Sequence, residues 1–349
     1  MASQQEPGHP LKFGVWYDFR NPRLWPRSYA RLYRESLAQI EWADELGFES
    51  VWLSEHHFTD EAYLPAMLPM LAAVAARAKR MRIGTAALLA PLHHPLRVAE
   101  DTSVVDHLSG GRLELGLAPG YRPEEFEALG VPHSERGSRT DELVDILKTA
   151  WRGKPFSYTG RHYTLRDVQV TPAPFQRPHP PLWIGGGSRA AARRAGRLGC
   201  HFMPDWAASP AVHDVYRDTL VESGYLPERF RVCMNRQIYV CEDPEEGWRE
   251  VGEHYLYSFN RYREWFAAAG DFPELGAPLA SSDELPRDVH LVGTPEMVIK
   301  DIQQIQKTYS FERFIFFANP PGLPIERGSQ SLELLAQEVM PHFADTPSG

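Results

Sequence analysis

The segment Val51-Trp-Leu-Ser-Glu-His-His-Phe58 places a carboxylate and two imidazoles directly after a short apolar run. Apolar residues 51–53 indicate a buried strand, and in a barrel of alternating strands and helices the chemistry lies at the C-terminal strand ends. Glu55, His56 and His57 are therefore candidate catalytic residues for acid–base work near neutral pH. Adjacent strand side chains point to opposite faces, so the two imidazoles cannot chelate one metal ion, and no metal site is predicted. The alternative is a solvated strand end with one histidine bonded to backbone.

A glycine-rich turn follows the apolar segment 182–184. Gly186, Gly187 and Ser188 stand at the start of a predicted helix, where backbone N–H groups approach a phosphate closely and the helix end favours an anion. These three residues are candidates for binding a cofactor phosphate. The alternative is a flexible turn in which Ser188 caps the helix.

The same turn also fits a dinucleotide-binding fingerprint, Gly185-x-Gly187-x-x-Ala190, with Asp205 further along the chain. Four predicted strand–helix units precede it, whereas this fingerprint usually opens a doubly wound sheet. A nicotinamide-binding domain is therefore the weaker interpretation.

Two further loops carry polar side chains. Arg122 follows the predicted strand 112–118 and is a candidate phosphate partner, because a guanidinium is planar and always charged; the alternative is a surface arginine. The third predicted strand ends at His93, His94 and Pro95. One of these histidines could line the barrel mouth, but a structural turn closed by Pro95 is the favoured interpretation.

Several aromatic residues lie at predicted strand ends. A planar, largely apolar ligand needs such walls, although ordinary barrel packing also explains them. The candidates for the substrate pocket are Trp16, Tyr17, Phe58, Trp206 and Phe317.

The order of elements predicts a single α/β domain, a (β/α)8 TIM barrel over residues 11–345 with insertions at about 153–181 and 268–293, after a disordered segment 1–10. The first insertion has the turn residues of a hairpin. The strands expected from apolar runs are 12–18, 50–55, 82–90, 112–118, 182–186, 200–204, 230–241 and 311–318. The helices expected between them are 28–46, 65–79, 95–108, 138–151, 188–198, 209–223, 244–267, 295–308 and 329–343.

The composition excludes several classes of protein. A formal net charge of -9 argues against nucleic acid or an anionic membrane as a partner. The three cysteines lack a metal-ligand spacing and favour a reducing compartment without disulfides. With a polar start and no apolar run long enough to span a membrane, a cytoplasmic protein is expected.

Six segments, in order, resemble the bacterial luciferase-like monooxygenases, with the greatest similarity to the luciferase α subunit. They are SVWLSEHHF, RIGTAALLAPLHHPLRVAED, SGGRLELGLAPGY, PLWIGGGS, VGTPEMVIKDI and VMPHF. The resemblance implies a TIM barrel that receives reduced FMN from a separate NAD(P)H:flavin reductase. Oxygen adds to the flavin as a C4a-peroxide, which then oxygenates a small organic substrate.

The resemblance also carries site residues over. His56 matches the catalytic acid/base histidine near the flavin, His57 matches its neighbour, and Glu55 is expected to orient them. Ala86-Ala87 matches a non-prolyl cis peptide beneath the flavin ring. The remaining cofactor-binding candidates are Tyr121, Arg122 and the phosphate-binding residues Gly186, Gly187 and Ser188.

The chain departs from luciferase at two positions. Pro119 stands where luciferase has an arginine on the phosphate, so that contact is missing or comes from Arg122, and Ala118 replaces the reactive cysteine. Light emission and long-chain aldehyde specificity are therefore in doubt. A mobile loop at 268–290 is expected to close over the site, and a homodimer is expected through helices 65–79 and 95–108.

Two alternative functions follow from the same residues. A deazaflavin-dependent hydride transferase belongs to the same superfamily, and oxygen dependence separates it from a monooxygenase. A flavin-binding protein without turnover is the other alternative, which the intact Glu55-His56-His57 segment disfavours.

Overall fold

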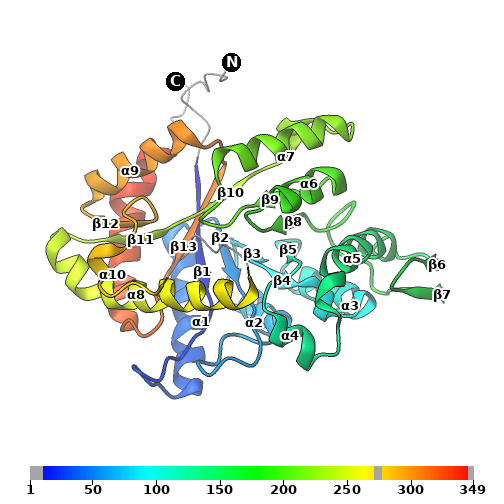
Figure 1. Cartoon of the computed structure of the whole chain (residues 1–349), viewed down its shortest axis with the longest axis horizontal. Helices are drawn as coiled ribbons and strands as arrows, with labels where there is room; N and C mark the ends of the chain where they lie inside the picture. The colour runs from blue at the N-terminus through cyan, green and yellow to red at the C-terminus, as the bar shows by residue number, and fades with distance from the viewer. Residues whose placement is uncertain (1–10, 271–276, 345–349) are drawn as a thin grey trace.

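The computed structural model describes residues 11–270 and 277–344. Eight parallel strands form a barrel at its centre (Figure 1), in the order β10-β13-β1-β2-β3-β5-β8-β9. A parallel bridge between Phe202 and Val232 joins β9 to the residue before β10 and closes the ring. The barrel strands are β1 Lys12–Tyr17, β2 Ser50–Leu53, β3 Arg82–Thr85, β5 Leu113–Ala118, β8 Leu182–Gly185, β9 His201–Met203, β10 Cys233–Asn235 and β13 Arg313–Phe317. The predicted α/β barrel is confirmed.

Helices surround the strands, which are buried on both faces as parallel barrel strands must be. Gly47, with φ of 95°, ends the first helix in the left-handed region, which glycine adopts without strain. The helices are α1 Tyr29–Leu46, α2 Met67–Arg77, α3 Pro95–Leu108, α4 Pro123–Ala128, α5 Arg136–Ala150, α6 Arg189–Leu198, α7 Pro210–Glu222, α8 Pro244–Ala269, α9 Pro295–Thr308 and α10 Ile325–Leu334. In the described part of the chain, no helix has the length and apolarity needed to cross a bilayer.

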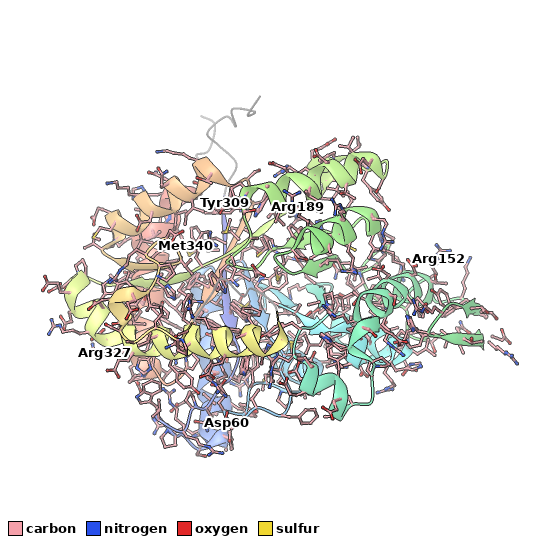
Figure 2. The ribbon with its side chains drawn as sticks, viewed as in Figure 1. Asp60, Arg152, Arg189, Tyr309, Arg327 and Met340 are labelled. Atoms are coloured by element: carbon pink, nitrogen blue, oxygen red, sulfur yellow. The ribbon has the colours of Figure 1, made fainter. Side chains whose placement is uncertain are left out.

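Side chains fill the space between the barrel and its helices, and exposed residues such as Arg152 and Asp60 lie at the periphery (Figure 2). The 153–181 segment includes an antiparallel hairpin, β6 Phe156–Thr159 and β7 Thr164–Val168, which projects from the side of the molecule beside α5 (Figure 1).

The expected strand 230–241 is two strands. β10 ends at Asn235, and β11 Gln237–Val240 leaves the barrel to pair in parallel with β12 His290–Gly293. The apolar positions Val232, Met234, Ile238 and Val240 keep one alternating phase on both sides of the break, and only the charged Arg236 interrupts them. β12 lies in a segment that was expected to be irregular, and the short α4 lies in an expected loop.

A buried ion pair holds the N-terminal end of the barrel. The Arg313 guanidinium donates to the Glu114 carboxylate at 2.7 Å and 3.2 Å, and the Trp183 indole N–H donates to the same carboxylate at 2.6 Å. The guanidinium also lies 5.2 Å from the rings of Trp52 and Trp183. Burial opposes ionisation of Glu114, but the nearby Arg313 prevails and lowers the carboxyl pKa to about 2. This charged layer lies at the N-terminal strand ends, opposite the end at which chemistry is expected.

Candidate active site

A cavity of about 640 Å³ lies at the C-terminal end of the barrel. Each barrel strand contributes to its wall, from the last residues of the strand or the loop that follows. The predicted site residues in this wall are Trp16, Glu55, His56, Ala86, Ala87, Tyr121, Gly186, Gly187, Ser188, Trp206 and Phe317. The volume falls within the range of cofactor pockets, which is about 300–1,000 Å³.

His56 stands in a hydrogen-bond chain. Its Nδ1 lies 2.9 Å from Glu125 Oε1, and its Nε2 lies 3.1 Å from the Tyr121 hydroxyl. Burial raises the pKa of Glu125, but hydrogen bonds from the His56 ring and the His57 backbone outweigh it, so the carboxyl pKa is lowered. An ionised Glu125 makes Nδ1 the donor, which leaves Nε2 to accept the Tyr121 proton or to exchange one in the cavity.

Glu125 was missed by the sequence reasoning because it lies on α4, where a loop was expected. The signal was Pro123 followed by Glu124 and Glu125, since proline and acidic residues are favoured in a first helical turn. The short helix aims the carboxylate back at the loop after β2, where it also accepts the His57 backbone N–H at 2.8 Å.

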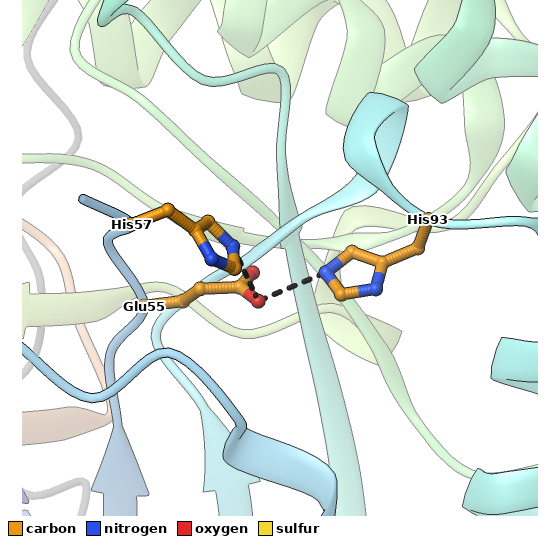
Figure 3. Close-up of side chains that lie close together, drawn as sticks. All are labelled: Glu55, His57 and His93. Atoms are coloured by element: carbon orange, nitrogen blue, oxygen red, sulfur yellow. Dashed lines mark hydrogen bonds and ion pairs between the residues drawn. The ribbon is translucent and has the colours of Figure 1, made fainter. Parts of the chain in front are cut away.

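His57 does not line the cavity, and its ring lies beside the Glu55 carboxylate. Its Nε2 lies 3.2 Å from Glu55 Oε1, and His93 Nε2 lies 2.9 Å from the same oxygen (Figure 3). Burial opposes ionisation of Glu55, but the neighbouring His57 and His93 imidazoles outweigh it and lower the Glu55 pKa to about 2. Of the two histidines that Glu55 was expected to orient, it contacts His57 and not His56, and its other partner is His93.

Three further predictions of site residues need correction. Tyr17 turns outward, and its hydroxyl donates to Gln39 on α1 at 2.9 Å. Phe58 has φ of 56° and a side chain on the outer surface, where the residue is 65% exposed. Arg122 pairs with Glu125 at 3.1 Å and lies over the Trp265 ring at 4.8 Å. Its guanidinium therefore does not line the cavity.

The glycine turn after β8 lies in the cavity wall beside the Asp205 carboxylate. Gly186 has φ of 130°, and a Cβ on Gly187 would meet the Asp205 carboxylate at 2.2 Å, so side chains are excluded from both positions. Ser188 caps α6 by accepting the Ala191 backbone N–H at 3.2 Å. The cap that was offered as an alternative thus exists, and the neighbouring Gly186 backbone N–H donates to the Met203 carbonyl at 3.2 Å.

Arg136 and Arg194 also line the cavity, and sequence reasoning missed both. Arg194 extends from α6 toward Gly137, whose added Cβ would lie 2.6 Å from the guanidinium, and its Nε donates to Asp141 at 2.8 Å. Arg194 lies in the helix that begins at the glycine turn, which was an available signal. Both arginines thus lie in the cavity wall, where Arg122 was expected.

A further wall comes from α8, with Tyr255, Ser258, Phe259, Tyr262 and Phe266. The Tyr262 hydroxyl lies 3.0 Å from that of Tyr63, which lies 2.6 Å from Ser54 Oγ. Burial raises the pKa of Tyr262 to about 12, so these hydroxyls are neutral hydrogen-bonding groups. Their helical spacing was a readable signal, because positions three and four apart share one face.

In the cavity wall, the peptide bond joining Ala86 and Ala87 is cis, as the family resemblance implied. The cavity thus combines an apolar body, one imidazole, a glycine turn at a helix N-terminus and two arginines. These features suit a planar cofactor that carries a phosphate. The fold and the site define an α/β-barrel protein with a cofactor-sized cavity at the strand ends.

The sequence model of the family described as luciferase-like monooxygenase matches residues 11–310, and the chain belongs to this family. The oxygenase component of flavin-dependent trigonelline monooxygenase from Acinetobacter baylyi is 26% identical over 332 residues, covering 90% of this chain and 91% of that protein. The crystal structure of monooxygenase RslO1 from Streptomyces bottropensis is similar with a TM-score of 0.83 and 28% identity, covering 96% of this chain and 100% of that one. The oxygenating constituent of 3,6-diketocamphane monooxygenase from Pseudomonas putida, solved with FMN, has a TM-score of 0.80 at 21% identity, covering 95% and 98% of the chains.

Proposed function

We propose that this chain is the oxygenase component of a two-component, flavin-dependent monooxygenase. It takes reduced FMN from a separate NAD(P)H:flavin reductase and uses O2 to oxygenate a small organic substrate, with the C4a-peroxide of the flavin as the oxygenating species. The observation that carries the proposal is one cavity that joins the His56–Tyr121 pair to a glycine turn flanked by Arg136 and Arg194. Family membership supports the same reaction class.

Different residues of the cavity wall bind the phosphate, contact the flavin ring and exchange a proton. Arg136, Arg194 and the N-terminus of α6 at Ser188 hold the phosphate. The Gly186 backbone N–H is donated to the Met203 carbonyl at 3.2 Å, so this glycine provides space rather than a donor. Ala86 and Ala87 on one wall and the aromatic face of α8 on another accommodate a ring system. His56 holds or releases a proton at Nε2, because Glu125 fixes the other ring nitrogen.

Burial of the wall also excludes water from the reacting atoms. The side chains of Trp16, Tyr255 and Phe317 are buried, and the apolar groups around His56 keep stray protons from a reactive oxygen species. Such exclusion favours transfer of oxygen to a substrate over loss as hydrogen peroxide. The apolar wall also favours a substrate that is itself largely apolar.

Anaerobic titration of the full-length chain tests the cofactor assignment. We expect reduced FMN to bind at least 10-fold more tightly than reduced riboflavin, because riboflavin lacks the phosphate. A reduced deazaflavin that bound more tightly than reduced FMN and passed a hydride to an acceptor without oxygen would support the alternative hydride transferase. Equal affinities for FMN and riboflavin would contradict the proposed phosphate site at the glycine turn, Arg136 and Arg194.

A further inference from the structure

Three atoms of the kind that bind transition metals converge beside the flavin cavity (Figure 3). They are Glu55 Oε1, His57 Nε2 and His93 Nε2, and all lie within 4.8 Å of one another. The carboxylate oxygen is 3.2 Å from the His57 nitrogen and 2.9 Å from the His93 nitrogen. His57 and His93 reach this oxygen from the loop after β2 and from the segment after β4 Leu88–Leu89.

The three groups are fixed by contacts that leave their facing atoms available. Glu55 Oε2 accepts the Leu89 backbone N–H at 2.7 Å, so only Oε1 is turned toward the histidines. The His57 backbone is held by Glu125 at 2.8 Å. Such support orients ligands in advance of binding, as outer contacts do in metal sites.

The two histidines differ in how they contact the Glu55 carboxylate. Both imidazoles approach one carboxylate oxygen, and His57 Nε2 is buried without an aligned hydrogen-bond partner among the described residues. Ligand atoms about 3 Å apart are spaced as they are around an ion held by bonds of about 2.0–2.2 Å. An ion between the three atoms would use the His57 lone pair without requiring a linear N–H···O contact.

The cluster also has an approach from solvent. The Glu55 side chain is fully buried and that of His57 is 14% exposed, whereas that of His93 is 27% exposed. An ion can therefore reach the three ligands past the edge of the His93 ring, without passing through the flavin cavity.

We propose that Glu55, His57 and His93 form a binding site for one divalent transition-metal ion of the zinc class. Two imidazoles and one carboxylate select Zn²⁺, Co²⁺ or Ni²⁺ over Mg²⁺ and Ca²⁺, which prefer oxygen ligands. The remaining coordination positions are filled by water. This site goes beyond the proposed function and stands whether or not the neighbouring cavity binds flavin.

Co²⁺ titration of the chelator-treated, full-length protein tests this site, because the visible absorption of Co²⁺ reports its ligands. We expect one Co²⁺ per chain, displaced by Zn²⁺ and not by Mg²⁺. His93→Gln should weaken Co²⁺ binding at least 10-fold, since it removes one of three protein ligands. Zn²⁺ should raise the melting temperature of the wild-type protein and have a smaller effect on the variant.

His94→Asn is the matched control. His94 is an exposed neighbour whose Nδ1 accepts the Leu96 backbone N–H at 3.3 Å at the start of α3, and asparagine keeps a capping side chain. Co²⁺ affinity unchanged by His94→Asn and lowered by His93→Gln supports the site. Wild-type affinity in His93→Gln, or loss of binding in both variants alike, would overturn it. His57→Gln provides a second ligand variant, and reduced FMN affinity measured on the same samples tests the flavin proposal separately.

Discussion

His56 has one hydrogen bond on each ring nitrogen, which sets the expected result of replacing it. Asparagine can keep the bond to Glu125 but cannot exchange a proton near neutral pH. We expect His56→Asn to lower turnover by about 10²–10⁴-fold, the usual contribution of a general acid or base. The affinity for reduced FMN should change less than two-fold.

The measurement for His56 is product formation with a flavin reductase present, beside a reduced FMN titration. The exposed His342 offers a control, and His342→Asn should leave both quantities unchanged. Turnover equal to wild type in His56→Asn would remove His56 from the mechanism.

Arg194 provides a second prediction at this scale. Neutralising it in Arg194→Gln should weaken reduced FMN binding by about 1–3 kcal/mol, the range for a hydrogen bond to a charged group. Reduced riboflavin binding should be unchanged, because it has no phosphate. Arg193→Gln changes an exposed arginine next to it on α6 and should affect neither ligand. Equal losses for FMN and riboflavin in Arg194→Gln would mean that the arginine only supports the fold.

Some site residues were predictable from sequence and others were not. His56 and the glycine turn follow apolar strands directly, so strand ends located them. Arg136 and Arg194 line the cavity from helices, and Glu125 contacts His56 from α4, so no strand pattern points to them. Arg122 was misplaced because its partner Glu125 could not be seen while α4 was expected to be a loop.

At the scale of elements, α3 presents an apolar face. Val104 is 48% exposed and Leu108 is 55% exposed one turn later, and the family resemblance implies pairing through α2 and α3. We expect Leu108→Glu to convert a homodimer into a monomer at micromolar concentration, measured by light scattering. Val221→Glu, at an exposed apolar position on α7, is the control and should leave the mass unchanged. A wild-type monomer would contradict the expected dimer.

Most helices and strands could be predicted from the sequence, because short apolar runs indicate strands and apolar residues at helical spacing indicate helices, as with β1 and α1. The departure of β11 from the barrel was not readable, since pairing partners decide it and its partner β12 lies about fifty residues further on in a Pro- and Gly-rich segment. Residues 271–276 of the expected closing loop lie outside the described residues, and closure over the site stays a prediction.

At the scale of the whole molecule, the Arg313–Glu114 pair should control stability and its pH dependence. Glu114→Gln leaves the guanidinium buried without its main counter-charge, and we expect a loss of about 3–5 kcal/mol in the free energy of unfolding. Glu100→Gln breaks an exposed pair with Arg97 and should cost no more than about 1 kcal/mol. Urea unfolding of the three proteins measures both effects.

The pH dependence of this loss has a definite sign. The Glu114 pKa is lowered from 4.5 to about 2, so its ionised form stabilises the fold above pH 4.5 and that contribution is lost as the pH falls toward 2. The difference in the free energy of unfolding between wild type and Glu114→Gln should therefore become smaller as the pH falls from 4.5 toward 2. If this difference in unfolding free energy did not change with pH, Glu114 would not stabilise the fold through its charge.

The central claim is that this barrel uses reduced FMN to activate oxygen. The most direct measurement is rapid mixing of the anaerobic complex with O2 while the flavin absorbance is followed. We predict an oxygen adduct of the flavin that forms before oxidised FMN appears and outlasts the one formed by free reduced FMN. Oxidation of bound reduced FMN in a single step, at the rate of the free flavin, would contradict the claim.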